Sequence, residues 1–236
     1  MNLEDRRAEL TANLGRVRAR IAAACEAVDR NPREITLVAV TKTFPASDVA
    51  LLAGLGVRDI GENRDQNAAA KAREVAAAGV SVTWHFVGQL QRNKVRSVVR
   101  YAGLVHSVDR PSIADALGKA AAELRDTPLD VLVQVSLDDA PGRGGVVTAE
   151  LSALAERGAA TESLRLRGLM AVAPLGEDPD PAYRRLAEVA AELRGGFPQA
   201  TVLSAGMSVD LESAVRHGAT HLRIGTALLG QRPPLG

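Results

Sequence analysis

The chain has few of the residues that mark several common classes of protein. Aromatic residues make up 3% of its 236 residues, and Cys25 is its single cysteine. The low aromatic content argues against a surface that stacks nucleic-acid bases, and one cysteine allows neither a disulfide framework nor a thiolate metal site. We therefore expect no nucleic-acid partner and no metal, and we expect Cys25 to be buried on the apolar face of the first helix.

An excess of one charge and long hydrophobic runs are also missing. Lys and Arg number 29 against 28 Asp and Glu, a net charge of +1, so the chain has no overall electrostatic attraction to nucleic acid or membrane surfaces. The N-terminus is charged from residue 4 onward and lacks the apolar core of a signal peptide; no stretch approaches the length of a bilayer span. These absences predict a cytoplasmic protein with no membrane partner, and the lack of an exposed apolar stripe favours a monomer.

Hydrophobic residues make up 46% of the chain, which is ample for a core. Their spacing predicts an amphipathic helix over residues 3–29 and then strands that alternate with helices. The predicted strands cover residues 35–42, 57–61, 81–87, 104–108, 129–137, 167–172, 201–204 and 220–224.

Eight such units predict an α/β fold, a single (β/α)8 TIM barrel over residues 1–236 with an extra N-terminal helix. An open doubly wound sheet is the alternative, but it usually has fewer strands and a glycine fingerprint after the first strand, which residues 41–44 lack.

The first predicted strand is a near-continuous apolar run that ends at Lys42. Such a run is typical of a strand buried on both faces. Burial lowers the pKa of an ammonium group, and a neutral amine is a nucleophile toward aldehydes. The alternative is a lysine whose charged end simply extends into solvent at the end of the strand.

The functional face of such a barrel is the C-terminal end of its strands, and the loops after strands seven and eight are its usual phosphate site. In this chain those loops run from Ser204 to Ser208 and from Arg223 to Thr226. Glycines let backbone N–H groups approach an anion, hydroxyls add donors, and Ser208 can begin a helix whose N-terminus favours phosphate. A capped helix with a tight turn is the alternative, because Asp210 and Glu212 would satisfy the helix dipole without a ligand.

A Schiff-base lysine, a phosphate site opposite it and an arginine beside that site together describe a pocket for pyridoxal phosphate. The protein must hold the aldehyde, the phosphate and the pyridine nitrogen of this cofactor. Arg223 cannot accept a proton, so it would donate to a neutral pyridine and leave a weaker electron sink than an aspartate would. This predicts muted carbanion chemistry.

The sequence also closely resembles the pyridoxal phosphate homeostasis protein family, which is similar to the barrel domain of alanine racemases and ornithine decarboxylases. The resemblance is carried, in order along the chain, by Leu37–Lys42, Gly61–Asn63, Trp84–Gly88, Leu90–Gln91 with Asn93–Lys94, His106–Asp109, Gly168–Ala171, Leu203–Ser204, Gly206–Asp210 and Arg223–Ala227. Departures at Arg64, Asp65, Gln89, Arg92 and Ala205 put the shape of loops in doubt.

The resemblance implies a pyridoxal phosphate aldimine on Lys42, with Arg223 at the ring nitrogen and Asn63 near the ring. It implies that Ser204, Ser208, Gly225 and Thr226 hold the phosphate. His85 lines the pocket in this interpretation; a histidine packed at a strand end is the alternative. Met170 and Gly206 complete the candidate site residues.

The resemblance further implies a protein that buffers or delivers the cofactor in vitamin B6 balance, with pyridoxal-phosphate-dependent apo-enzymes as possible recipients. Racemisation needs a second acid or base opposite the lysine, and we expect neither Tyr101 nor Tyr183, placed at helix ends, to supply it. The chain also stops soon after the eighth unit, so we expect no second domain over the pocket and no catalytic residue. A racemase-like enzyme, and a barrel that uses Lys42 on a phosphorylated sugar without cofactor, are the alternatives.

Two basic features lie outside this site. Residues 91–96, with Arg100 beyond them, form a basic stretch that is more often a solvated face than a docking surface. Arg143, in the glycine-rich loop 138–145, could reach over the mouth of the barrel, although the glycines of such a loop also suit a simple turn.

Overall fold

The computed structural model describes residues 2–138, 144–174 and 176–231. Within these residues eight strands pair in parallel and in chain order, and β1 pairs with β8 to close the barrel. The strands are β1 (Thr36–Val40), β2 (Asp59–Glu62), β3 (Thr83–Phe86), β4 (Ala102–Val108), β5 (Leu129–Gln134), β6 (Leu164–Met170), β7 (Val202–Ser204) and β8 (His221–Ile224). The predicted (β/α)8 fold is confirmed.

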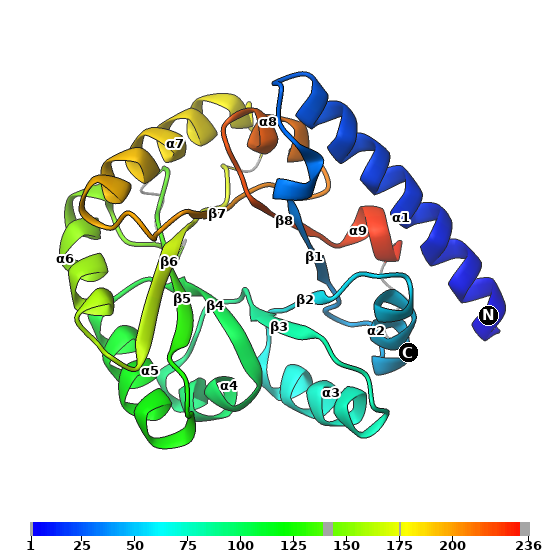
Figure 1. Cartoon of the computed structure of the whole chain (residues 1–236), viewed down its shortest axis with the longest axis horizontal. Coiled ribbons are helices and arrows are strands. Elements are labelled where there is room, and N and C mark those ends of the chain that lie inside the picture. The colour runs from blue at the N-terminus through cyan, green and yellow to red at the C-terminus, as the bar shows by residue number, and fades with distance from the viewer. Residues whose placement is uncertain (1, 139–143, 175, 232–236) are drawn as a thin grey trace.

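Helices surround the ring of strands (Figure 1). They are α1 (Leu3–Glu26), α2 (Ala46–Gly54), α3 (Asp65–Ala77), α4 (Val95–Tyr101), α5 (Pro111–Leu124), α6 (Thr148–Ala159), α7 (Pro179–Gly196), α8 (Leu211–Arg216) and α9 (Thr226–Leu229), with short 3-10 turns η1 (Pro32–Glu34) and η2 (Arg92–Lys94). The extra helix α1 lies along the outside of the barrel, next to α8 and α9. No described helix is long and apolar enough to cross a membrane.

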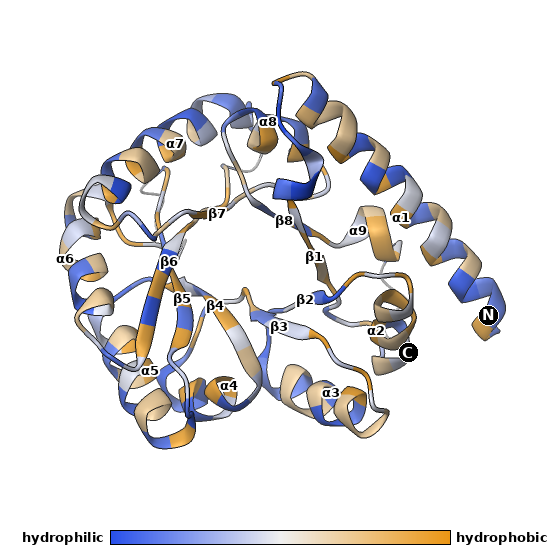
Figure 2. Ribbon diagram, in the orientation of Figure 1, coloured by the Kyte–Doolittle hydropathy of each residue, from blue (hydrophilic) through white to orange (hydrophobic). Residues whose placement is uncertain are grey.

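The hydrophobic residues form two separate clusters. The larger cluster fills the layer between the strands and the helices. Hydrophobic and hydrophilic residues alternate along these helices (Figure 2). Cys25 is fully buried in this cluster, as predicted, and burial raises the pKa of its thiol. The smaller cluster, Leu104, Leu132 and Met170, joins strands β4, β5 and β6. The polar residues His85, His106, Ser204 and Arg223 share the barrel interior with it and are all buried.

Several predicted element boundaries are wrong in ways that matter for the site. Strand β1 ends at Val40, so Lys42 lies beyond the strand in a turn in which Thr43 has a φ of 72°. Helix α8 begins at Leu211 rather than at Ser208, and it is only 6 residues long. Strand β6 begins at Leu164, three residues before the predicted start. Arg143 lies outside the described residues.

Candidate functional site

A cavity of about 470 Å³ opens at the C-terminal end of the strands, within the size range of small-molecule sites. Its wall brings together six predicted site residues that lie far apart in the sequence: Lys42, Asn63, Ser208, Arg223, Gly225 and Thr226. Sequence reasoning did not assign the rest of the wall: Val40, Thr43, Phe44, Val87, Gly88, Val172, Met207, Val209 and Gly230. Most of these follow strand ends, which is the signal that could have identified them.

Lys42 is an exposed side chain in the wall of the cavity. Of the two alternatives for Lys42, the structure agrees with the lysine that extends into solvent and not with the buried one, because strand β1 ends at Val40 and the chain turns before it reaches Lys42. Lys42 has no hydrogen bond or ion pair to any described residue. Its amine is therefore free to react with a molecule in the cavity.

A second lysine lies close behind Lys42 and is fully engaged by the protein. Lys71, on α3, is 8% exposed and forms an ion pair with the buried Glu62. Its Nζ also donates to the carbonyl of Thr41 at 2.8 Å, and the Thr41 hydroxyl donates to Glu62 Oε1 at 2.8 Å. This cluster fixes the backbone immediately before Lys42 and occupies the ammonium group of Lys71.

Asn63 reaches the cavity because Gly88 allows two loops to touch. A Cβ atom at Gly88 would lie 2.1 Å from the carbonyl oxygen of Asn63, far inside contact distance. No other residue type fits there unless the loop after β2 moves. Gly88 therefore sets the position of Asn63.

Donors for an anion come from both loops that the fold uses for phosphate. The Ser208 hydroxyl accepts a hydrogen bond from the backbone N–H of Ala227 at 3.1 Å, which ties the loop after β7 to α9 and leaves the hydroxyl hydrogen free to donate. Thr226 is the first residue of α9, where helix geometry leaves the backbone N–H without an intrahelical partner. Because α8 begins at Leu211, its N-terminus does not contribute donors to this anion site. Asp210 accepts a hydrogen bond from Tyr183, and Glu212 accepts one from Arg20.

Arg223 is a buried cation held by two fixed acceptors. Its Nη1 donates to the Ser204 hydroxyl at 2.6 Å and its Nη2 donates to the Ala171 carbonyl at 2.8 Å. Burial lowers the pKa of Arg223, and the nearby Tyr183 and Asp210 oppose this effect; arginine nevertheless stays protonated in proteins. Arg223 is also one of the residues that line the cavity.

Four predicted site residues do not line the cavity. Ser204 is fully buried and binds Arg223 and His106 instead. His85 is 2% exposed and hydrogen-bonds His106, which is the predicted alternative of a packed histidine. Met170 packs with Leu104 and Leu132 inside the barrel.

Gly206, the fourth, has a φ of 87°, and its carbonyl accepts from the Arg223 backbone at 3.0 Å. None of these four residues is part of the cavity wall.

Neither tyrosine lines the cavity, as predicted. The Tyr183 hydroxyl donates to Asp210 at 2.7 Å and accepts from the Gly206 N–H at 3.2 Å, and burial raises its pKa. Burial likewise raises the pKa of Tyr101, which lies near Asp65 and Glu62. Among the described residues no group of histidine, cysteine and acidic side chains could hold a metal ion.

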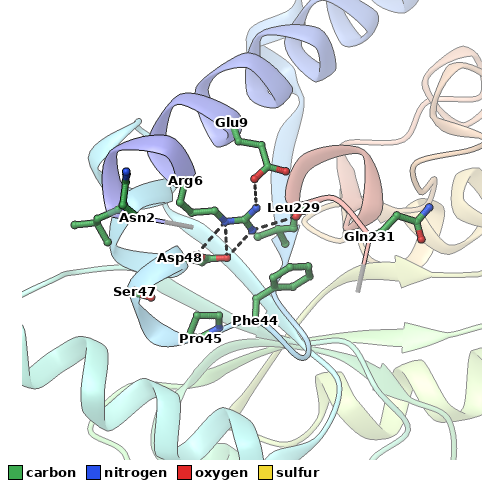
Figure 3. A pocket seen from close by; sticks show the side chains of 10 residues that line it. Asn2, Arg6, Glu9, Phe44, Pro45, Ser47, Asp48, Leu229 and Gln231 are labelled. Carbon is green, nitrogen blue, oxygen red and sulfur yellow. Dashed lines mark hydrogen bonds and ion pairs between the residues drawn. The ribbon is translucent and has the colours of Figure 1, made fainter. Parts of the chain in front are cut away.

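Helix α1 borders a neighbouring cavity of about 400 Å³, and an ion cluster forms part of its wall (Figure 3). Arg6 donates to Asp48 and Glu9 and to the Leu229 carbonyl at 3.1 Å, and its guanidinium lies 5.4 Å from the centre of the Phe44 ring. These partners use the hydrogen-bonding capacity of Arg6 within the protein. We therefore regard this cavity as a structural junction and not as a second ligand site.

Comparisons with known proteins agree with this geometry. Residues 12–233 match the family described as alanine racemase, N-terminal domain. An alanine racemase structure from Corynebacterium glutamicum is 17% identical with a TM-score of 0.64, and the match covers 98% of this chain and 62% of that one. The chain is thus a barrel of the alanine racemase type.

Two further similarities are much closer. The pyridoxal phosphate homeostasis protein of Mycobacterium bovis is 47% identical, and the match covers 97% of this chain and 95% of that protein. PipY of Synechococcus elongatus, solved with pyridoxal phosphate bound, is 34% identical with a TM-score of 0.82 over 94% of this chain and 100% of that one. The chain belongs to the family of pyridoxal phosphate homeostasis proteins.

Proposed function

We propose that the chain binds pyridoxal phosphate at the C-terminal mouth of the barrel and takes part in keeping the supply of this cofactor balanced in the cell. The observation that carries the proposal is the shared cavity, where Lys42, Arg223 and the two phosphate-type loops meet. Each recognises a different part of the cofactor: an amine for the aldehyde, a cation for the ring nitrogen, and hydroxyl and N–H donors for the phosphate. The pyridoxal phosphate bound to PipY supports the same assignment.

Lys42 is the residue that would hold the cofactor covalently. Its exposed amine would condense with the aldehyde, forming a C=N bond and releasing one water molecule. Lys71 is a poor competitor, because its ammonium group is buried against Glu62 and donates to Thr41. The bond to Lys42 would therefore be the only covalent attachment at this site.

A carrier role fits the surroundings of Lys42 better than catalysis does. Arg223 would donate to the ring nitrogen and leave the cofactor a weak electron sink, and both tyrosine hydroxyls are directed elsewhere. Lys42 and the 83% exposed Val209 lie in the cavity wall at the protein surface. An accessible site of this kind suits release of the cofactor to apo-enzymes that depend on it.

Absorbance of the purified protein with added pyridoxal phosphate tests the proposal. We expect a yellow band that borohydride converts to a stable adduct on Lys42, found by peptide mass spectrometry, and that Lys42→Ala abolishes. Lys71→Ala is the matched control and should keep the band. A colourless wild-type protein would refute the proposal and favour a barrel that uses Lys42 on another aldehyde, while saturable racemisation of an amino acid would refute the carrier role.

A further inference from the structure

A row of polar side chains crosses the barrel interior from its N-terminal end to the candidate site. Asp59 Oδ1 lies 3.0 Å from His85 Nε2, and His85 Nδ1 lies 2.9 Å from His106 Nε2. His106 Nδ1 lies 2.9 Å from Ser204 Oγ, which accepts from Arg223 at 2.6 Å. We call these five residues the interior chain. Only Asp59, at the start of β2, is partly exposed, with 32% of its side chain accessible.

The chemistry of the two ends fixes the direction of every hydrogen bond between them. Arg223 can only donate, and an ionised Asp59 can only accept. If both histidines are neutral, His85 must carry its hydrogen on Nε2 to reach Asp59, so its Nδ1 accepts from His106 Nε2. His106 Nδ1 then accepts from the Ser204 hydroxyl, whose oxygen accepts from Arg223. One arrangement satisfies all four bonds.

The competing arrangement leaves a buried group without a partner. A doubly protonated His85 would donate to His106 Nε2 and shift the hydrogen of His106 to Nδ1, where it would donate to Ser204. The Ser204 hydroxyl hydrogen would then have no acceptor among the described residues, and leaving a buried hydrogen bond unmade is unfavourable. Burial also lowers the pKa of His106 well below its usual value.

We propose that Asp59, at the far end of the barrel, sets the direction of the interior chain and thereby positions the Arg223 guanidinium. His85, His106 and Ser204 are positioning residues that transmit this orientation. Arg223 makes no ion pair with a described carboxylate, so it is held by neutral acceptors while its charge stays available to the cavity. The part of this inference that concerns the cofactor rests on the proposed function.

The hydrogen-bond directions can be tested without any ligand. Two-dimensional 1H–15N spectra of histidine side chains at pH 8 report which ring nitrogen carries hydrogen. The chain has four histidines, and His217→Gln and His221→Gln identify the two signals that lie outside the interior chain. We expect both His85 and His106 to be neutral with hydrogen on Nε2. A hydrogen on Nδ1 of either ring, or on both nitrogens, overturns the proposal.

Variants of Asp59 test its control over the chain. Asp59→Ala removes the acceptor, so we expect Nδ1-protonated forms to appear at His106, two hydrogen bonds away, and the Kd for pyridoxal phosphate to rise about three- to tenfold. Asp59→Asn keeps a carbonyl acceptor and should restore both properties. Asp130→Ala is the matched control, because Asp130 is a strand aspartate on β5 that pairs with Arg165 and Arg167 and has no part in the interior chain.

Unchanged His106 signals and an unchanged Kd in Asp59→Ala would overturn the proposal, as would an Asp59→Asn variant that behaves like Asp59→Ala. If the wild-type protein binds no pyridoxal phosphate, the proposed function fails, and the histidine spectra alone then decide whether Asp59 directs the interior chain.

Discussion

At the scale of single residues, the site depends on one glycine that lets two loops meet. Gly88 faces Asn63 so closely that an added methyl group would overlap the Asn63 carbonyl. The clash is with backbone and not with a flexible side chain, so it cannot be relieved by a rotamer change. The loop after β2 would have to shift, and Asn63 would move with it.

We therefore expect Gly88→Ala to lower the free energy of unfolding by about 1–3 kcal/mol and to weaken binding of pyridoxal phosphate. Gly15→Ala is the control, because nothing lies within 4 Å of its added Cβ in helix α1, and alanine there should stabilise the protein by up to about 1 kcal/mol. Urea unfolding and a cofactor titration measure both quantities. Equal stability of the two variants would contradict the prediction.

At the scale of elements, helix α1, on the outside of the barrel, forms hydrogen bonds with the loop after β7 and with α9. Asn13, which is 7% exposed, donates to the Leu228 carbonyl in α9 at 2.9 Å. Arg20 donates to the Ser208 carbonyl at 2.9 Å and to both oxygens of Glu212 at the start of α8. Together with Arg6 at the Leu229 carbonyl (Figure 3), these contacts explain how a helix outside the barrel can affect the site.

Replacing Asn13 tests this role of α1. Asn13→Ala leaves the Leu228 carbonyl at a helix end without its donor, so we expect a loss of about 1–2 kcal/mol in the free energy of unfolding and weaker cofactor binding through displacement of α9. Thr11→Ala is the matched control, because Thr11 is exposed on the same helix and its hydroxyl binds only the Arg7 carbonyl. Should both variants bind cofactor as well as the wild type, α1 would not support the site.

At the scale of the whole molecule, folding buries histidine side chains in the barrel and lowers their pKa. Burial, more than the nearby charges, lowers the pKa of His221 to about 4, and burial also lowers the pKa of His106 well below its usual value. The unfolded chain protonates both rings near pH 6.5. Between pH 6.5 and about 4 the unfolded state therefore binds more protons, so stability is complete above pH 6.5 and falls as the pH falls.

We expect the free energy of unfolding to drop by up to about 1.4 kcal/mol per pH unit for each of these histidines across that window. His221→Gln should reduce the slope of the free energy of unfolding against pH by the contribution of one histidine, whatever its effect on stability at pH 8. Urea unfolding at intervals from pH 8 to pH 4.5 measures the slope. A His221→Gln slope equal to that of the wild type would show that His221 is not the titrating group.

The sequence by itself determined the barrel and six residues of the cavity wall. The local spacing of hydrophobic residues predicts the strands and helices. Residues that follow parallel strands must lie together at one end of a closed barrel. This is why Asn63, Ser208, Arg223 and Thr226 could be expected in one place, and they do line one cavity.

Only the tertiary structure decided what lies beneath that wall. The exposure of Lys42 depends on a turn in which Thr43 takes a positive φ, which no hydrophobic pattern predicts. The partners of Ser204 and His85 were missed because His106 lies 98 and 21 residues from them in the sequence. Long-range hydrogen bonds have no local signature; they exist because the closed sheet turns strands β2, β3, β4, β7 and β8 toward one another inside the barrel.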